Sequence, residues 1–176
     1  MQGVNKENIY RTEEALWQAV TEGCEVAFEQ LYRCYFSDLF YYGRQYLQEE
    51  DAVNDAIQDL FVDIWRTRRS LGQARSVKLY LMISLRRKIH RSLLPDQKNR
   101  RNWEEFPESI LPTHPSAEVL FAKQEEDFFQ AERLNEWLAQ LPPRQHEALI
   151  LRFYHDLEYN EIAELLDVRE QTSRNL

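Results

Sequence analysis

The side chains best suited to a chemical task in this sequence are cations, and they gather in one segment. Between Arg66 and Arg101 there are twelve Lys or Arg residues and a single acid, Asp96, which gives the segment a charge of +11. The whole chain has a net charge of −8, so the remainder carries −19. Because phosphate binding depends on the local density of Lys and Arg rather than on total charge, the segment favours contact with a nucleic-acid backbone over a merely solvated basic face.

The last eighteen residues have the pattern of a helix-turn-helix. Tyr159–Leu166 predicts a short amphipathic helix, with the small residue Ala163 where a second helix can cross it, and a polar break follows at Asp167–Arg169. The second helix ends with the chain at Leu176, about two turns in, so we expect it to be incomplete. Two ordinary packed helices are the alternative. The side chains that favour major-groove contact are Arg169, Gln171, Thr172, Arg174 and Asn175.

No pattern in the sequence predicts an enzyme, a metal site or a cofactor site. There is no Gly-rich phosphate loop, no metal-ligand spacing and no nucleophile motif, and the four His residues are scattered. We interpret Cys24 and Cys34 as two buried, reduced thiols of a cytoplasmic protein. Since no apolar run reaches the length of a membrane span, we expect no membrane insertion.

Long stretches without helix breakers predict an all-α fold made of two small helical domains, since the chain has only 4 Gly and 6 Pro. The first domain is expected at residues 12–95, a flexible linker at 96–116 and the second domain at 117–176. Within the first, helices are expected from Thr12 to the break at Gly23, then over residues 25–47, 48–65 and 77–94. A further helix is expected over residues 144–154 after Pro142 and Pro143. The two units should sample several arrangements unless a mutual interface fixes them.

The helix expected over residues 48–65 carries an acidic stripe beside its apolar face. Asp51, Asp55, Asp59 and Asp63 recur at every fourth residue, and no Lys or Arg occurs from Gln45 to Trp65 to balance them. Like charges at this spacing repel one another. The stripe is therefore either simply solvated or intended for a basic partner surface, with Phe61 and Trp65 as exposed apolar anchors, and we favour the partner.

The helix expected over residues 77–94 is predicted to have an apolar side and a basic side. Val77, Leu81 and Leu85 continue an apolar stripe, while the Lys and Arg residues fall on other faces. Together with the basic loop 67–76 before it, this helix would form a platform for phosphates. We expect His90 at its surface.

Three stretches in this order resemble a bacterial extracytoplasmic-function sigma factor. Phe28–Phe36 (FEQLYRCYF) is similar to the start of the family's second region, and Asp51–Trp65 (DAVNDAIQDLFVDIW) is similar to its polymerase-binding helix. Leu141–Tyr154 (LPPRQHEALILRFY), followed by Tyr159–Ala163 (YNEIA), is similar to its fourth region. The resemblance covers most of residues 25–176.

The resemblance implies a function in transcription initiation, with core RNA polymerase and promoter DNA as partners and an anti-sigma factor as a further one. The acidic helix would bind core polymerase, and the terminal helix-turn-helix would recognise the minus-thirty-five element through the five polar residues given above. The implied polymerase contacts are Asp55, Gln58, Asp59, Phe61 and Trp65. The implied contacts to the minus-ten element and the melted strands are Leu71, Gly72, Gln73, Arg75, Ser76, Lys78, Tyr80, Arg86, Arg87 and Arg91.

Two positions depart from the family pattern. Tyr80 is the nearest candidate for the aromatic residue used in melting, and Asp167 replaces the usual Gly of the helix-turn-helix turn. Two alternative functions remain. The chain could be a helix-turn-helix regulator that binds duplex DNA without polymerase, or a polymerase-binding or anti-sigma-binding module without full promoter recognition.

Overall fold

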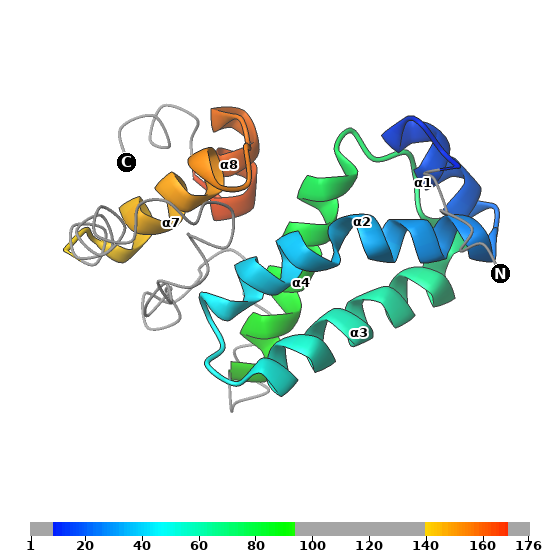
Figure 1. Cartoon of the computed structure of the whole chain (residues 1–176). Helices are drawn as coiled ribbons and strands as arrows, with labels where there is room; N and C mark the ends of the chain where they lie inside the picture. The colour runs from blue at the N-terminus through cyan, green and yellow to red at the C-terminus, as the bar shows by residue number, and fades with distance from the viewer. Residues whose placement is uncertain (1–8, 94–139, 169–176) are drawn as a thin grey trace, which may run out of the picture.

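The computed structural model describes residues 9–93 and 140–168, which form six α-helices, one 3-10 turn and no strand. This confirms the all-α prediction (Figure 1). The predicted linker 96–116, the start of the second domain and the helix from Glu170 lie outside the described residues. None of the described helices is long and apolar enough to cross a bilayer. The helices are α1 (Glu13–Thr21), α2 (Glu25–Arg44), α3 (Glu50–Thr67), α4 (Val77–Leu93), α7 (Pro143–Phe153) and α8 (Tyr159–Leu166), with the 3-10 turn η1 at Arg68–Ser70.

The first four helices enclose the main apolar core. α2 and α3 lie side by side, and α4 packs against both of them, while α1 contacts α2 and α4 (Figure 1). The apolar stripes predicted from the sequence meet here, with Leu31 and Leu39 of α2, Ile57 of α3 and Leu81 and Leu85 of α4 almost completely buried. Burial of these side chains is the main stabilising contribution to this unit.

Local chemistry explains where several helices begin and end. The Oγ1 atom of Thr12 accepts a hydrogen bond from the backbone N–H of Ala15 at 3.2 Å, which caps α1. Gly23 adopts φ +95°, so it separates α1 from α2 by a turn that a residue with a side chain would strain. At the end of α8, Asp167 lies in the left-handed region at φ 55° and ψ 49°. The Asp that replaces the family's usual Gly therefore takes the left-handed conformation itself.

The helix-turn-helix begins as predicted, and it lies against the first unit. α7 starts at Pro143 and α8 spans Tyr159–Leu166, and the two helices contact each other. Ala163 is buried, as a close helix crossing requires. α8 also contacts α4 (Figure 1). A mutual interface therefore holds the two units together in this structure.

Three expectations about exposure were wrong. Phe61 is only 3% exposed, because its ring packs against Phe28 and Tyr32 of α2 instead of extending into solvent. His90 is buried, because it lies on the side of α4 that carries Arg86 rather than on an outer face. Neither thiol is in a disulfide within the described part of the chain, and neither is buried: Cys34 is exposed and Cys24 is half-buried.

The close approach of α2 and α3 depends on Gly43, and this gives a first prediction. A Cβ atom at this position would lie 2.8 Å from Cγ1 of Val53, a stiff, fully buried β-branched side chain. Replacing Gly43 by Ala would gain little helix propensity, because the residue is in the last turn of α2. The cost of overpacking against Val53 is therefore expected to be larger than this gain. Gly43→Ala should lower the free energy of unfolding by about 1–2 kcal/mol in a denaturant titration. In the matched control, Gly72→Ala, the new methyl group meets nothing within 4 Å, so an equal loss of stability there would contradict the explanation.

Candidate functional site

The loop between η1 and α4 contains half of the residues implied for the minus-ten element, and α1 holds it in place. The indole Nε1 of Trp17 donates a hydrogen bond to the carbonyl oxygen of Gly72 at 2.9 Å, and its ring lies edge-to-face with Tyr80, with ring centroids 5.3 Å apart. One carboxylate oxygen of Glu13 accepts from the backbone N–H of Lys78 at 3.3 Å. The Oγ of Ser76 accepts from the N–H of Leu79 and caps α4. Two residues of α1 thus fix the loop, one near its start and one at the beginning of α4.

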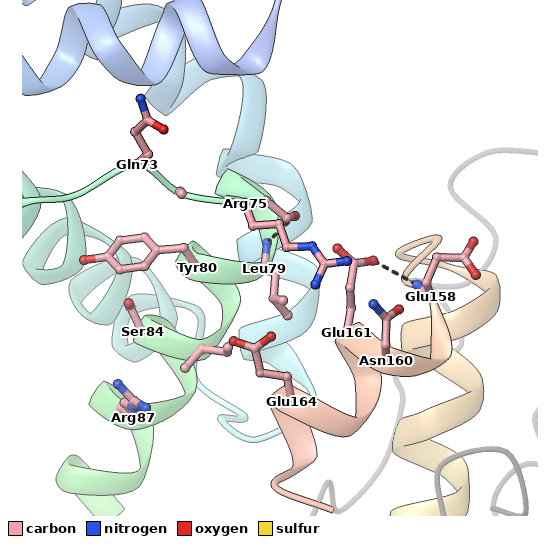
Figure 2. Close-up of a pocket in the computed structure, with 13 residues that line it drawn as sticks. Gln73, Arg75, Leu79, Tyr80, Ser84, Arg87, Glu158, Asn160, Glu161 and Glu164 are labelled. Carbon is pink, nitrogen blue, oxygen red and sulfur yellow. Dashed lines mark hydrogen bonds between the residues drawn. The ribbon is translucent and has the colours of Figure 1, made fainter. Parts of the chain in front are cut away.

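A pocket of about 500 Å³ opens beside this loop and along α4. Five of the implied minus-ten residues line it, and they come from the loop and from successive turns of α4: Gln73, Arg75, Ser76, Tyr80 and Arg87 (Figure 2). The opposite wall is formed by α8 and the residue that caps it, through Glu158, Asn160, Glu161 and Glu164. The structure therefore brings half of the implied residues together, and it faces them with carboxylates.

The other cationic side chains of α4 differ in whether they form ion pairs. The Nζ atom of Lys78 pairs with Asp38 of α2 at 2.8 Å, and that of Lys88 pairs with Asp63 of α3 at 2.6 Å. The hydrogen bond from Lys88 lowers the pKa of Asp63 below its ordinary value. Arg87 is exposed at the pocket, and no ion pair to it occurs among the described residues.

Arg86 does not lie on an exposed basic face, which corrects the prediction for this side of α4. Its side chain is buried, with the residue only 5% exposed. One guanidinium nitrogen donates to the carbonyl oxygen of Leu165 in α8 at 2.7 Å, and Nε lies 3.5 Å from Oε1 of Glu147 in α7. In this arrangement Arg86 is occupied by the second unit and is not accessible to a phosphate.

Glu147 is the centre of a polar cluster between the two units. It is completely buried, and the same oxygen, Oε1, accepts hydrogen bonds from the hydroxyl of Tyr42 at 3.3 Å and from the hydroxyl of Tyr46. Its second oxygen has no hydrogen-bond partner among the described residues. Burial therefore raises the pKa of Glu147, even though Arg86 and the two phenols oppose the shift.

Arg86 remains charged in this cluster. Burial alone would lower the pKa of its guanidinium, but Tyr46, Tyr42 and Glu147 outweigh that effect and leave the pKa raised. Arg86 and Glu147 form a buried ion pair, and the hydroxyls of Tyr42 and Tyr46 donate to its carboxylate. Removing one member of such a pair is costly, because the other charge is left without compensation in a medium of low dielectric constant.

Aromatic rings surround this cluster on the α2 side. Tyr41 packs edge-to-face on Tyr154, and Tyr42 packs edge-to-face on His155, with ring centroids 5.8 Å apart in each pair. His155 is almost fully buried. Burial raises the pKa of Tyr154 to about 12. The interface thus combines a desolvated polar centre with packed rings.

The residues implied for polymerase binding lie on α3. Asp55, Gln58 and Asp59 are exposed, and neither aspartate has an ion pair among the described residues. Gln58, Phe61 and Trp65 line a groove between α2 and α3. Val62 also lines this groove, and 53% of its surface is exposed. Of the acidic stripe, only Asp63 is neutralised within the described part of the chain.

Sequence reasoning missed the role of four residues: Trp17, Tyr42, Tyr46 and Glu147. A signal was present for Glu147, because it lies three residues before Ile150 and four before Leu151, on the buried stripe of α7. An acid at such a position needs a buried partner. Likewise, Arg86 continues the buried series Leu79 and Met82 along α4. The residues implied for the minus-thirty-five element, Arg169 to Asn175, lie outside the described residues.

Comparisons with known proteins agree with this arrangement. The family model for Sigma-70 region 2 matches residues 31–99, and that for Sigma-70, region 4 matches residues 131–176. Among solved structures, the chain is similar to CnrH in its complex with the cytosolic domain of CnrY, at a TM-score of 0.60 and 18% identity, over 92% of this chain and 87% of that one. This similarity supports the fold. No curated protein matches the chain.

The hydrogen bond from Trp17 to the loop gives a second prediction. Trp17→Phe keeps an aromatic ring but removes the donor to Gly72, so the loop should lose about 0.5–1.5 kcal/mol of local stability. Amide hydrogen exchange over residues 71–76 should become faster, while exchange in α2 and α3 stays the same. Trp65→Phe is the matched control, because no hydrogen bond from its indole is found among the described residues. Unchanged exchange in the loop of Trp17→Phe would show that the contact does not hold it.

Proposed function

The chain belongs to the sigma-70 family of transcription initiation factors, as its resemblance to the extracytoplasmic-function group predicted, and from this we propose where each partner binds. In this proposal α3 binds core RNA polymerase, and the loop with α4 holds promoter DNA at the point of melting. The observation that carries it is the segregation of charge: unpaired aspartates are exposed on α3, whereas Arg75 and Arg87 are exposed at the pocket.

The α3 surface supports a protein partner of positive charge. Asp55 and Asp59 are exposed one helical turn apart, and the groove beside them is lined by Phe28, Phe61 and Trp65, whose rings pack at centroid distances of 4.8 and 5.8 Å. A preformed aromatic groove beside unpaired acids supplies both an apolar anchor and electrostatic complementarity. Phe61 acts in this proposal by shaping the floor of the groove, since it is buried.

The pocket supports a single strand of DNA. Tyr80 offers a ring for base stacking, Gln73 and Ser76 offer hydrogen-bonding groups, and Arg75 and Arg87 offer phosphate contacts (Figure 2). Extruding a base from the duplex costs a few kcal/mol, which such contacts together with counterion release offset. We propose that Lys78 and Arg91 extend the phosphate contacts along α4 and that Leu71 and Gly72 shape the mouth of the pocket.

A protein regulator is a further proposed partner. The solved structure to which the chain is similar holds CnrH bound to the cytosolic domain of CnrY. By analogy we propose that this chain binds an anti-sigma factor and acts in the cytoplasm, and that its helix-turn-helix recognises the minus-thirty-five element through residues after Val168.

The polymerase surface is tested by charge reversal. Asp59→Lys should weaken binding to core polymerase at least tenfold in a pull-down titration, because it places a cation where a basic partner is expected. Glu14→Lys makes the same change of charge on α1 and should leave the affinity within about twofold of the parent chain. Equal affinities for the Asp59→Lys variant and the parent would refute the assignment.

The promoter surface is tested by salt dependence. Arg87→Ala should weaken binding of the polymerase complex to promoter DNA. It should also make the slope of log affinity against log salt less steep, by the amount that about one phosphate contact contributes. Arg33 is a suitable control, since it already pairs with Glu29 at 2.6 Å on α2, so Arg33→Ala should leave the slope unchanged. A slope unaltered by Arg87→Ala would exclude Arg87 from phosphate contact.

A further inference from the structure

Two side chains of α1 support the pocket that the proposed function assigns to DNA, although neither of them lines it. Glu13 and Trp17 are four residues apart, so they lie one turn apart on the same face of α1. The indole of Trp17 bonds to Gly72 of the loop and packs on the ring of Tyr80. Glu13 bonds to the backbone at the start of α4. One face of α1 therefore holds both the loop and the helix that carries the ring.

The loop has few restraints of its own, which makes the contact with Trp17 important. In the described part of the chain, residues 72–75 form no hydrogen bond with another backbone group. The space beside Gly72 is open, because a Cβ atom at this position would meet nothing within 4 Å. Trp17, by contrast, is only 4% exposed, so its ring is fixed in the core. The hydrogen bond from its single donor is therefore a principal restraint on the exposed part of the loop.

The first turn of α4 is held by both α1 and α2. The same carboxylate oxygen of Glu13 accepts from the hydroxyl of Tyr35 in α2 and from the backbone N–H of Lys78. Burial, together with the bond to Glu13, raises the pKa of Tyr35, so the phenol keeps its proton and stays a donor. The Nζ atom of Lys78 pairs with Asp38 of α2 at 2.8 Å. Tyr80 lies at the end of this turn, so the position of its ring is fixed as well.

An extruded base would contact the loop and the ring of Tyr80 at the same time. In the proposed function the base stacks on Tyr80, while Gln73 and Ser76 bond to its edge, and in Figure 2 the loop that carries Gln73 runs past the ring of Tyr80. Attraction between packed atoms falls steeply with distance, and a gap of about 0.5–1 Å forfeits about a quarter to a half of it. A small shift of the loop relative to the ring should therefore weaken binding of the base.

We propose that Glu13 and Trp17 are positioning residues for promoter melting, which hold the loop and the ring of Tyr80 at the separation that accepts an extruded base. They act through the loop and through α4 and do not contact the DNA themselves. The inference rests on the proposed function of the pocket and adds to it a role for α1, a helix that carries none of the residues implied for promoter DNA.

The expected effect follows from how often the loop adopts the arrangement that accepts a base. If only a fraction f of the molecules has this arrangement, the apparent dissociation constant rises by a factor of 1/f. Loss of one hydrogen bond changes such a population by about fivefold. Closed duplex DNA is held mainly through its phosphates and places no base on Tyr80, so its affinity should change by less than about twofold.

The test compares two DNA oligonucleotides bound by the complex of the full chain with core polymerase. One is a promoter-like fork with a single-stranded arm, and the other is the closed duplex of the same sequence. A fluorescent base analogue at the first unpaired position reports stacking through the quenching of its emission. The variants are Trp17→Phe, which keeps a ring but removes the donor, and Glu13→Ala, which removes the acceptor.

In Trp17→Phe the affinity for the fork should fall about fivefold and the quenching should decrease, while the affinity for the duplex stays within about twofold of the parent. Glu13→Ala should behave in the same way. Glu13→Gln keeps an acceptor oxygen and should retain most of the parent's preference for the fork. Glu14→Ala is the matched control, since it makes the same truncation at the adjacent, exposed position and should change neither affinity.

A second measurement tests whether Trp17 acts through Tyr80. Tyr80→Ala alone should lower the affinity for the fork, because the stacking contact is lost. When Trp17→Phe is added to Tyr80→Ala, the affinity for the fork should change by less than about twofold, because the loop no longer has a ring with which to be aligned. A fivefold effect that persists in the Tyr80→Ala background would overturn the positioning role of Trp17.

Equal losses of affinity for the fork and the duplex would also overturn the inference, because a general loss of stability acts on both. An affinity for the fork that is unchanged in Trp17→Phe and Glu13→Ala would do the same. Failure of the proposed function gives a different result. If the parent complex itself shows no preference for the fork over the duplex, the pocket holds no single strand, and the proposed function is refuted together with the inference.

Discussion

The arrangement of the two units depends on one buried charge. Glu147 has left water completely, and the cost of that desolvation is offset mainly by Arg86 and the two tyrosine hydroxyls, with a smaller contribution from Arg144. Arg86 and the two tyrosines come from the other unit, so most of this compensation requires contact between the units. A purely apolar interface would tolerate sliding, because apolar contacts are non-directional. The ion pair instead fixes the orientation of α7 and α8 on α2 and α4.

The charged side chains of α3 and α4 are distributed in a way that fits this interface. On α3, Asp55 and Asp59 are exposed and have no ion pair within the described part of the chain, so they remain available to a partner, whereas Asp63 pairs with Lys88 of α4. The cations of α4 are divided between internal pairs, the interface and the pocket, with Lys88, Arg86 and Arg87 as one example of each. A net charge of −8 is thus compatible with a surface built for DNA, because the negative charge lies elsewhere.

The sequence predicted the helices well, because apolar periodicity, Gly23 and the proline pair act locally. The pattern predicted the boundaries of α8, and the family resemblance singled out Asp167 as standing in place of the usual Gly. Contacts between units could not be predicted in the same way, since nothing local says that an Arg on α4 will meet a Glu on α7. Arg86, His90 and Phe61 were therefore placed at the surface, although the first two lie on a second buried side of α4 and the third fills the contact between α2 and α3. The polar residues of the recognition helix remain predictions.

The central claim is that Glu147 and Arg86 stabilise the folded chain as a pair, and a double-mutant cycle measures this most directly. Free energies of unfolding would be compared for the parent, Glu147→Ala, Arg86→Ala and the double variant. Each single variant leaves a buried charge alone, whereas the double variant leaves none. The losses from the two single variants should therefore exceed the loss from the double variant by more than about 1 kcal/mol. Losses that add within about 0.5 kcal/mol would contradict the account, because independent residues behave in that way.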